Sequence, residues 1–185
     1  MPRLTPPSFA RRFWRDRRGV SAVEFALLAP VLILFYCGMA ELTQAMMAQR
    51  RLSNITASIG DLTAQRTRLT DADRTDIFTI GRTIMAPYPT TTLRMCLVSV
   101  SANAAGKATV DWSEPSNAPT GCPAAGAVLT TVPAAVLPAS QSVIMAKASY
   151  AYASPIRLIL PNDLTFSRTF YLRPRKSDSV ARAAT

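Results

Sequence analysis

The sequence predicts an α+β protein whose long N-terminal helix spans a membrane, continues as a stalk, and precedes a short helix packed on a small antiparallel sheet. Three observations lead to this prediction. An apolar run covers residues 20–40, helical periodicity continues to about residue 65, and β patterning dominates after residue 92. Since no internal repeat is present, the part after the stalk is expected to form one domain of about 120 residues.

Residues 1–19 form a basic leader. It holds six arginines and one aspartate, a net +5 (six minus one) out of +10 for the whole chain. The next 21 residues, 20–40, are long enough to cross a hydrocarbon core of about 30 Å as a helix. A basic block before an apolar span predicts a single-pass protein of the cytoplasmic membrane, with its N-terminus inside and its C-terminal domain exported.

The junction of leader and span carries the most informative motif, RRGVSAVEF at residues 17–25. The arginines end at Gly19, and Glu24 follows five residues later within the apolar run, directly before Phe25. A carboxylate in a membrane is costly unless it is paired, so Glu24 is a candidate functional residue. The alternative is that Glu24 lies at the headgroup boundary with its charge hydrated.

This motif, with ALLAP at residues 26–30 and GMAEL at residues 38–42, resembles the N-terminal region of TadE-like pseudopilins. These are type IV pilin-like proteins of Tad (Flp-type) pilus systems, and the resemblance covers residues 17–60. It implies that a prepilin peptidase cuts between Gly19 and Val20. It also implies that Glu24, followed by Phe25, pairs with the new terminal amine of a neighbouring subunit. Major pilins of these systems tend to carry Tyr at the position of Phe25.

The resemblance further implies a minor pilin-like subunit for assembly of a Tad-type pilus, which supports adhesion and biofilm formation. The expected partners are the prepilin peptidase, other pilin or pseudopilin subunits, the inner-membrane assembly platform and the lipid bilayer. Two other interpretations stay open. One is a permanently anchored envelope protein whose exported domain binds another envelope component. The other is an ordinary secretory signal that is cut before Glu41.

Composition argues against an enzyme and against a nucleic-acid-binding protein. The chain has no histidine, which rules out Ser–His and Cys–His pairs and leaves few metal ligands. A phosphate-binding Gly-rich loop is also missing from the sequence. Half of the basic excess lies in the leader and no nucleic-acid-binding motif accompanies the rest. We therefore expect no catalytic residue, no cofactor, no metal and no nucleic-acid partner.

Pro30 removes a backbone hydrogen bond in mid-span and is expected to kink the helix. Apolar positions then recur at steps of three and four along the stalk, residues 41–65, and are expected to face the exported domain, residues 66–173. The periodic positions in this stripe are Leu42, Met46, Gln49, Leu52, Ile55, Ile59 and Leu62.

Thr70 is the expected N-cap of a short helix that ends near Met85, with acidic residues in its first turn. The aspartates at 71, 73 and 76 lack the glycine and the distal glutamate of a calcium loop, so they are assigned to capping. The buried face of this helix is expected to carry Ile77, Ile80 and Ile84.

Four segments after this helix have strand patterning: residues 93–101, 107–112, 142–153 and 164–172. A long loop rich in Pro, Ala, Gly and Thr separates the second strand from the third, at residues 113–140. The polar tail, residues 174–185, is expected to fray.

Cys96 and Cys122 are the only cysteines outside the membrane region. An even pair in an oxidising compartment predicts a disulfide, which would tie the first strand to the long loop. In the chain-entropy treatment, a loop of this size contributes about 3–4 kcal/mol to stability. Two free thiols or a metal site are the alternatives, although two cysteines without histidine make a poor zinc site.

Overall fold

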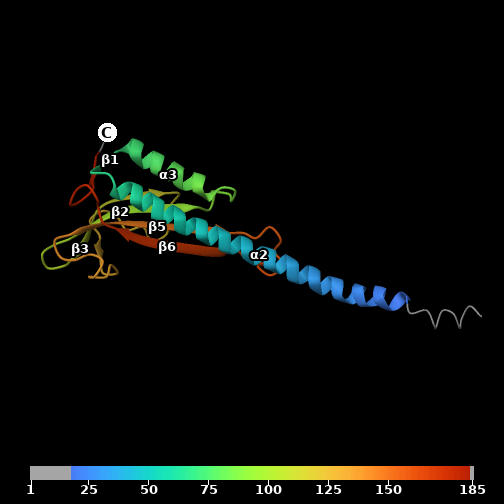
Figure 1. Cartoon of the computed structure of the whole chain (residues 1–185). Coiled ribbons are helices and arrows are strands. Elements are labelled where there is room, and N and C mark those ends of the chain that lie inside the picture. The colour runs from blue at the N-terminus through green and yellow to red at the C-terminus, as the bar shows by residue number, and fades with distance from the viewer. Residues whose placement is uncertain (1–17, 184–185) are drawn as a thin grey trace, which may run out of the picture.

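The computed structural model describes residues 18–183, so nearly all of the predicted basic leader lies outside the described residues. The largest element is α2 (Arg18–Ala64), one helix of 47 residues that joins the predicted span and stalk. Its first half extends away from the rest of the molecule, and its second half lies along the sheet (Figure 1). The predicted α+β class, with a long N-terminal helix followed by a short helix and an antiparallel sheet, is confirmed.

The main sheet is antiparallel, with the strand order β4-β3-β2-β5-β6. The strand bounds are β2 (Arg94–Ala102), β3 (Ala108–Ser116), β4 (Val128–Leu129), β5 (Ser142–Tyr152) and β6 (Leu164–Leu172). β2 pairs with both β3 and β5 and is therefore central. β3 continues four residues beyond its predicted end at Trp112, because Ser113 to Ser116 pair with the first half of β2.

The short helix, α3 (Asp71–Met85), begins at the predicted N-cap. The Thr70 hydroxyl accepts a hydrogen bond from the N–H of Asp73 (3.1 Å), and the Asp73 carboxylate accepts one from the N–H of Thr70 (3.2 Å). This reciprocal capping box satisfies two N–H groups at the helix start. The predicted inward face is partly wrong, because Ile80 is 41% exposed and Phe78 is buried instead.

Both faces of the sheet are covered at its centre. On one face, the second half of α2 packs with α3 over the strands, and Ile55 and Ile59 join Leu97 in a single core cluster. On the other face, Leu137 from the long connection between β3 and β5 packs with Val98 in a second cluster. The predicted surface loop thus forms a covering layer, which explains the nearly continuous apolar sequence of β2.

The inward face of the stalk differs from the predicted stripe. Leu42 and Met46 are 43% and 56% exposed, whereas Ala45 and Ala48 are buried in the core with the helices and strands. Small side chains allow a helix to approach a sheet closely, and a pattern based on large apolar residues overlooks them. The predicted stripe is therefore wrong at its membrane end and correct from Leu52 onwards.

The C-terminal tail is ordered over its described part, so the prediction that it frays is wrong there. β7 (Ala181–Arg182) pairs in parallel with β1 (Arg68–Leu69), a small second sheet that the sequence did not predict. Val180 is 1% exposed, and its carbonyl accepts a hydrogen bond from Trp112 Nε1 (2.6 Å). One buried valine with an indole partner thus anchors a segment that is otherwise polar.

Candidate functional site on the apolar half of the long helix

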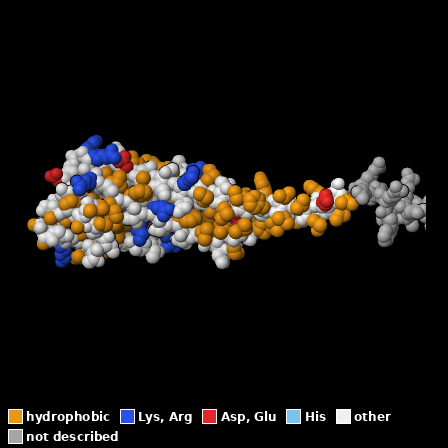
Figure 2. Space-filling model, turned by 60° about the horizontal axis from the view of Figure 1, so that its bottom comes forward, with side chains coloured by type: hydrophobic (Ala, Val, Ile, Leu, Met, Phe, Trp, Pro, Cys, Tyr) orange, Lys and Arg blue, Asp and Glu red, His pale blue; other side chains and the backbone are white. Residues whose placement is uncertain are grey.

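The apolar half of α2 stands free of the head, which we define as residues 65–183. By length and composition it can span a membrane, and it is the one such helix within the described residues. Nearly all side chains from residue 19 to residue 36 are exposed, and hydrophobic atoms cover the narrow helix in Figure 2. Glu24 is the single charged side chain between residues 19 and 40. This half of α2 is therefore a candidate span of a single-pass membrane protein.

The predicted cleavage bond, Gly19–Val20, lies in the first turn of α2. A Cβ atom added at Gly19 would have no heavy atom within 4 Å, and Val20 is 52% exposed. Glycine is a poor helix former, so this turn can open at little energetic cost. No other part of the described chain covers this bond.

Glu24 and Phe25 are both exposed, and Phe25 is 70% exposed. Within residues 18–183 the carboxylate of Glu24 has no hydrogen bond or ion pair. Glu24 lies one helical turn after Val20, on the same face of α2. Within a membrane, another molecule could supply a partner for this carboxylate, as could the terminal amine that cleavage would create on Val20.

Pro30 lies inside α2, and the helix continues through it. The proline has no N–H, so the carbonyl of Ala26 lacks its usual helical partner. The predicted kink stays a prediction, since helix continuity alone does not test it.

The end of the span carries a contact that sequence reasoning missed. The connection between β5 and β6, residues 153–163, folds against α2 at this level, where a Cβ at Gly38 would lie only 2.2 Å from Ile159 Cδ1. Glu41 is 1% exposed, and its Oε2 accepts hydrogen bonds from the N–H groups of Ile159 (2.7 Å) and Leu160 (3.3 Å). Glu41 and its two partners are more than 110 residues apart in the sequence, so no local sequence pattern predicts the contact.

Burial by itself would raise the pKa of the Glu41 carboxyl group. The Ser154 hydroxyl and the backbone N–H groups of Ile159 and Leu160 outweigh that effect, and the pKa lies below its ordinary value of 4.5. Glu41 is therefore ionised at neutral pH, because these donors favour the charged form. Its role in the described structure is to hold the connection between β5 and β6 against α2.

A pocket of about 470 Å³ opens beside Glu41 and is lined by Tyr88, Tyr150, Tyr152 and Ile156 among others. Burial raises the pKa of all three phenols, so they are neutral at physiological pH. Across residues 18–183, no group of three His, Cys, Asp or Glu side chains could hold a metal ion. The described part of the pocket wall is thus largely apolar and offers hydroxyl groups and one carboxylate.

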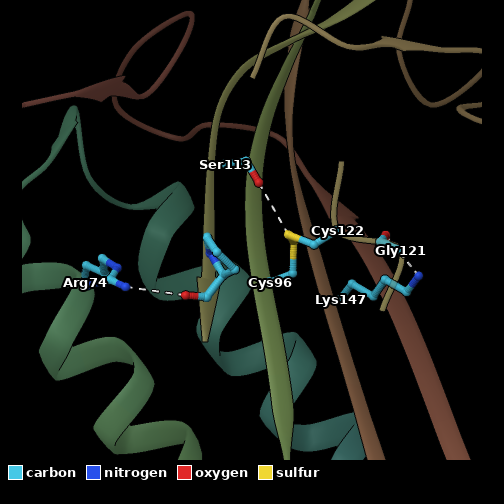
Figure 3. The surroundings of a disulfide bond; sticks show 7 residues. Arg74, Cys96, Ser113, Gly121, Cys122 and Lys147 are labelled. Carbon is cyan, nitrogen blue, oxygen red and sulfur yellow. Dashed lines mark hydrogen bonds between the residues drawn. A yellow bond between two sulfur atoms is a disulfide. The ribbon is translucent and has the colours of Figure 1, made fainter. Parts of the chain in front are cut away.

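Cys96 and Cys122 form the predicted disulfide, with their Cα atoms 5.9 Å apart (Figure 3). The bond joins β2 to the connection that covers the outer face of the sheet. Beside it, the Ser113 hydroxyl lies 3.3 Å from Cys122 Sγ, and Lys147 Nζ donates a hydrogen bond to the carbonyl of Gly121 (3.1 Å). These contacts fix the covering layer, and they lie far along the chain from the candidate span.

Comparison with known proteins bears on the candidate span. Residues 19–60 match the family model described as TadE-like protein. No curated protein matches the chain, and no solved structure matches it either. The match confirms the TadE-like resemblance over this segment and indicates a protein associated with the Tad pilus. It covers the candidate span and most of the stalk, and it ends before the head begins.

Proposed function

We propose that the protein is a pilin-like minor subunit that takes part in assembling a Tad-type pilus. In this proposal α2 anchors it in the cytoplasmic membrane with the N-terminus inside and the head exported. A prepilin peptidase removes the leader by cutting between Gly19 and Val20. The subunit then acts with other pilin-type subunits and the inner-membrane assembly platform, and through the pilus it supports adhesion and biofilm formation.

The observation that carries this proposal is the exposed apolar half of α2 with Glu24 as its single charge. A permanent anchor needs only apolar side chains, and a carboxylate within lipid is unfavourable unless it is paired. The amine that cleavage would create on Val20 is a cation at the same membrane face. Pairing of Glu24 with the amine of a neighbouring subunit would offset the cost of both charges and set the register between the two helices.

The continuity of α2 supports the same proposal. One helix of 47 residues joins the candidate span to the core of the head without a break. A shift of the span by one residue therefore moves the head by about 1.5 Å and turns it by about 100°. This coupling suits a subunit whose position in an assembly is set by contacts in the membrane. A head of this size also suits a minor subunit better than a major pilin.

The first test is the N-terminal sequence and intact mass of the protein purified from membranes, with and without the cognate prepilin peptidase. We expect a chain that starts at Val20 only when the peptidase is present. An uncut chain in both strains would replace the proposal with a permanently anchored envelope protein. A chain that starts at Glu41 would indicate an ordinary secretory signal, and the argument from Glu24 would fall.

The second test replaces the carboxylate. We expect Glu24→Ala and Glu24→Gln to abolish pilus assembly while leaving expression and cleavage largely unchanged, because each removes the charge and keeps the apolar helix. Ser21→Ala is the matched control, since it removes a polar group from the same exposed turn of α2. Normal piliation in the Glu24 variants would sink the pairing mechanism.

A further inference from the structure

The connection between β5 and β6 contains an apolar turn, PIRLILP at residues 155–161, whose side chains face outward. Ile156, Leu158 and Ile159 are 46%, 45% and 50% exposed. Within the described residues, six large hydrophobic side chains of the head are exposed, and three of them lie in this turn. Single exposed hydrophobic residues are ordinary, but a cluster of this kind indicates an interaction surface.

The apolar turn lies at the depth of the last turn of the candidate span. Ile159 fills the space that the missing Cβ of Gly38 leaves open. Gly38 is two residues from the end of the apolar run, which is about 3 Å along a helix. Figure 1 shows this connection beside α2 where the helix leaves the head, and in Figure 2 hydrophobic side chains continue from the helix onto that end. A bilayer that covers the span therefore also reaches the apolar turn.

Most N–H groups of the apolar turn have partners within the protein, which suits them to this depth. Irregular backbone is tolerated in a bilayer only where its polar groups have partners in the protein. The two prolines that bound the turn have no N–H to satisfy. The buried Ser154 Oγ accepts hydrogen bonds from the N–H groups of Ile156 (3.3 Å) and Arg157 (3.4 Å). The Glu41 carboxylate accepts them from the N–H groups of Ile159 and Leu160. Four of the five N–H groups in the turn thus donate hydrogen bonds to buried side-chain oxygens.

Arg157 interrupts the hydrophobic side chains at the tip of the turn. Its φ of +54° is a left-handed conformation that non-glycine residues rarely adopt, and such conformations persist where surrounding contacts enforce them. The side chain is 59% exposed and lies 3.6 Å from the exposed carboxylate of Asp163. A guanidinium group on a long stem can reach lipid phosphates while its neighbours enter the acyl region.

We propose that the apolar turn inserts into the outer leaflet of the membrane that α2 spans. Ile156, Leu158 and Ile159 enter the boundary between headgroups and acyl chains, and Arg157 binds headgroup phosphates. This inference rests on the proposed membrane span, and it adds a second contact that lies off the helix axis. The head is then held against the bilayer at a fixed tilt and rotation.

The test uses the full chain, with Cys37→Ser, in lipid nanodiscs. A single cysteine at Leu158 is labelled with an environment-sensitive fluorophore, and lipids spin-labelled near the headgroup serve as quenchers. Ile156→Cys repeats the measurement from a second position. Val128→Cys is the matched control, because Val128 is 50% exposed in β4 at the opposite end of the sheet. Leu28→Cys reports on the span itself, with lipids labelled deep in the acyl chain.

We expect blue-shifted emission and strong quenching at residues 158 and 156, with neither change at residue 128. Quenching at residue 28 without quenching at 158 and 156 would overturn the inference and leave the span intact. Blue-shifted emission at 158 without lipid quenching would also overturn it, since a second protein surface would then cover the turn. Absence of quenching at all positions would remove the proposed span, and the inference with it.

Discussion

The disulfide gives the most quantitative prediction. Cys96 and Cys122 are separated by 26 residues, and Cys96 is fully buried in β2. In the chain-entropy treatment, a cross-link that closes a loop of this length restricts the unfolded chain by about 3.5 kcal/mol at 25 °C. The double variant Cys96→Ala/Cys122→Ala should lower the free energy of unfolding by about that amount, since alanine keeps the strand without placing a polar group in the core.

This loss converts into a measurable shift in melting temperature. Unfolding entropy near 60 °C is about 2.1 cal/mol/K per residue, so the head together with the second half of α2, roughly 140 residues, has about 0.30 kcal/mol/K. A loss of 3.5 kcal/mol then lowers the Tm by about 12 °C. The assay is thermal unfolding of the full chain in detergent, followed by far-UV circular dichroism.

Two comparisons make the result interpretable. Reduced wild type should have the same Tm as the double variant, because both lack the cross-link. Cys37→Ala should have the same Tm as oxidised wild type, because Cys37 is the free thiol within the described residues. A double variant whose Tm stays within about 3 °C of wild type would refute the reasoning, since it would show that the loop is already restricted in the unfolded chain.

Two further predictions concern the capping box and Glu41. Thr70→Ala should lower the free energy of unfolding by about 1 kcal/mol, because it removes the N-cap of α3. Thr79→Ala, on the exposed face of that helix, should have a smaller effect, and chemical denaturation of both variants measures the difference. The pKa of Glu41 is lowered in the folded protein, so its carboxylate adds stability above the unfolded pKa and loses it as pH falls through the folded pKa. Wild type should therefore exceed Glu41→Gln in Tm at pH 7, and this difference should shrink below about pH 4.5; a difference independent of pH would contradict the assignment.

The local elements of the fold could be predicted because each depends on neighbours in sequence. The N-cap at Thr70 with acidic residues in the first turn is such a case, as is the apolar run that ends at Ala40. The four long strands after residue 92 were also found, with end errors of up to four residues, whereas the two-residue strands β4 and β7 were missed. The Cys96–Cys122 pairing followed from counting the cysteines of a domain that is expected to be exported, which needs no structure.

The features that could not be predicted are non-local. The burial of Val180 depends on Trp112, and the role of Glu41 depends on a connection more than 110 residues away. The inward position of Ala45, in place of Leu42, depends on how closely α2 approaches the sheet. None of these features can be predicted from the periodicity of the sequence. The candidate site on α2, by contrast, is local: the residues from Gly19 to Glu24 lie in one short segment, so a sequence motif can indicate it.

Glu24 lies on α2 and the apolar turn packs against the same helix, so the proposed insertion of the turn would do more than anchor the head. Its three hydrophobic side chains are about half exposed, so their burial in lipid stabilises the inserted state by roughly 2–4 kcal/mol in total. That is small beside a span of 21 residues, but the turn lies off the axis of α2 and resists rotation about it. Since α2 is one continuous helix, rotation of the head would also turn the segment that carries Glu24, and an inserted turn would then set the direction in which Glu24 points. If the protein enters a fibre as a pilin-like subunit, these side chains would exchange lipid for protein, so the surface that receives them should be apolar.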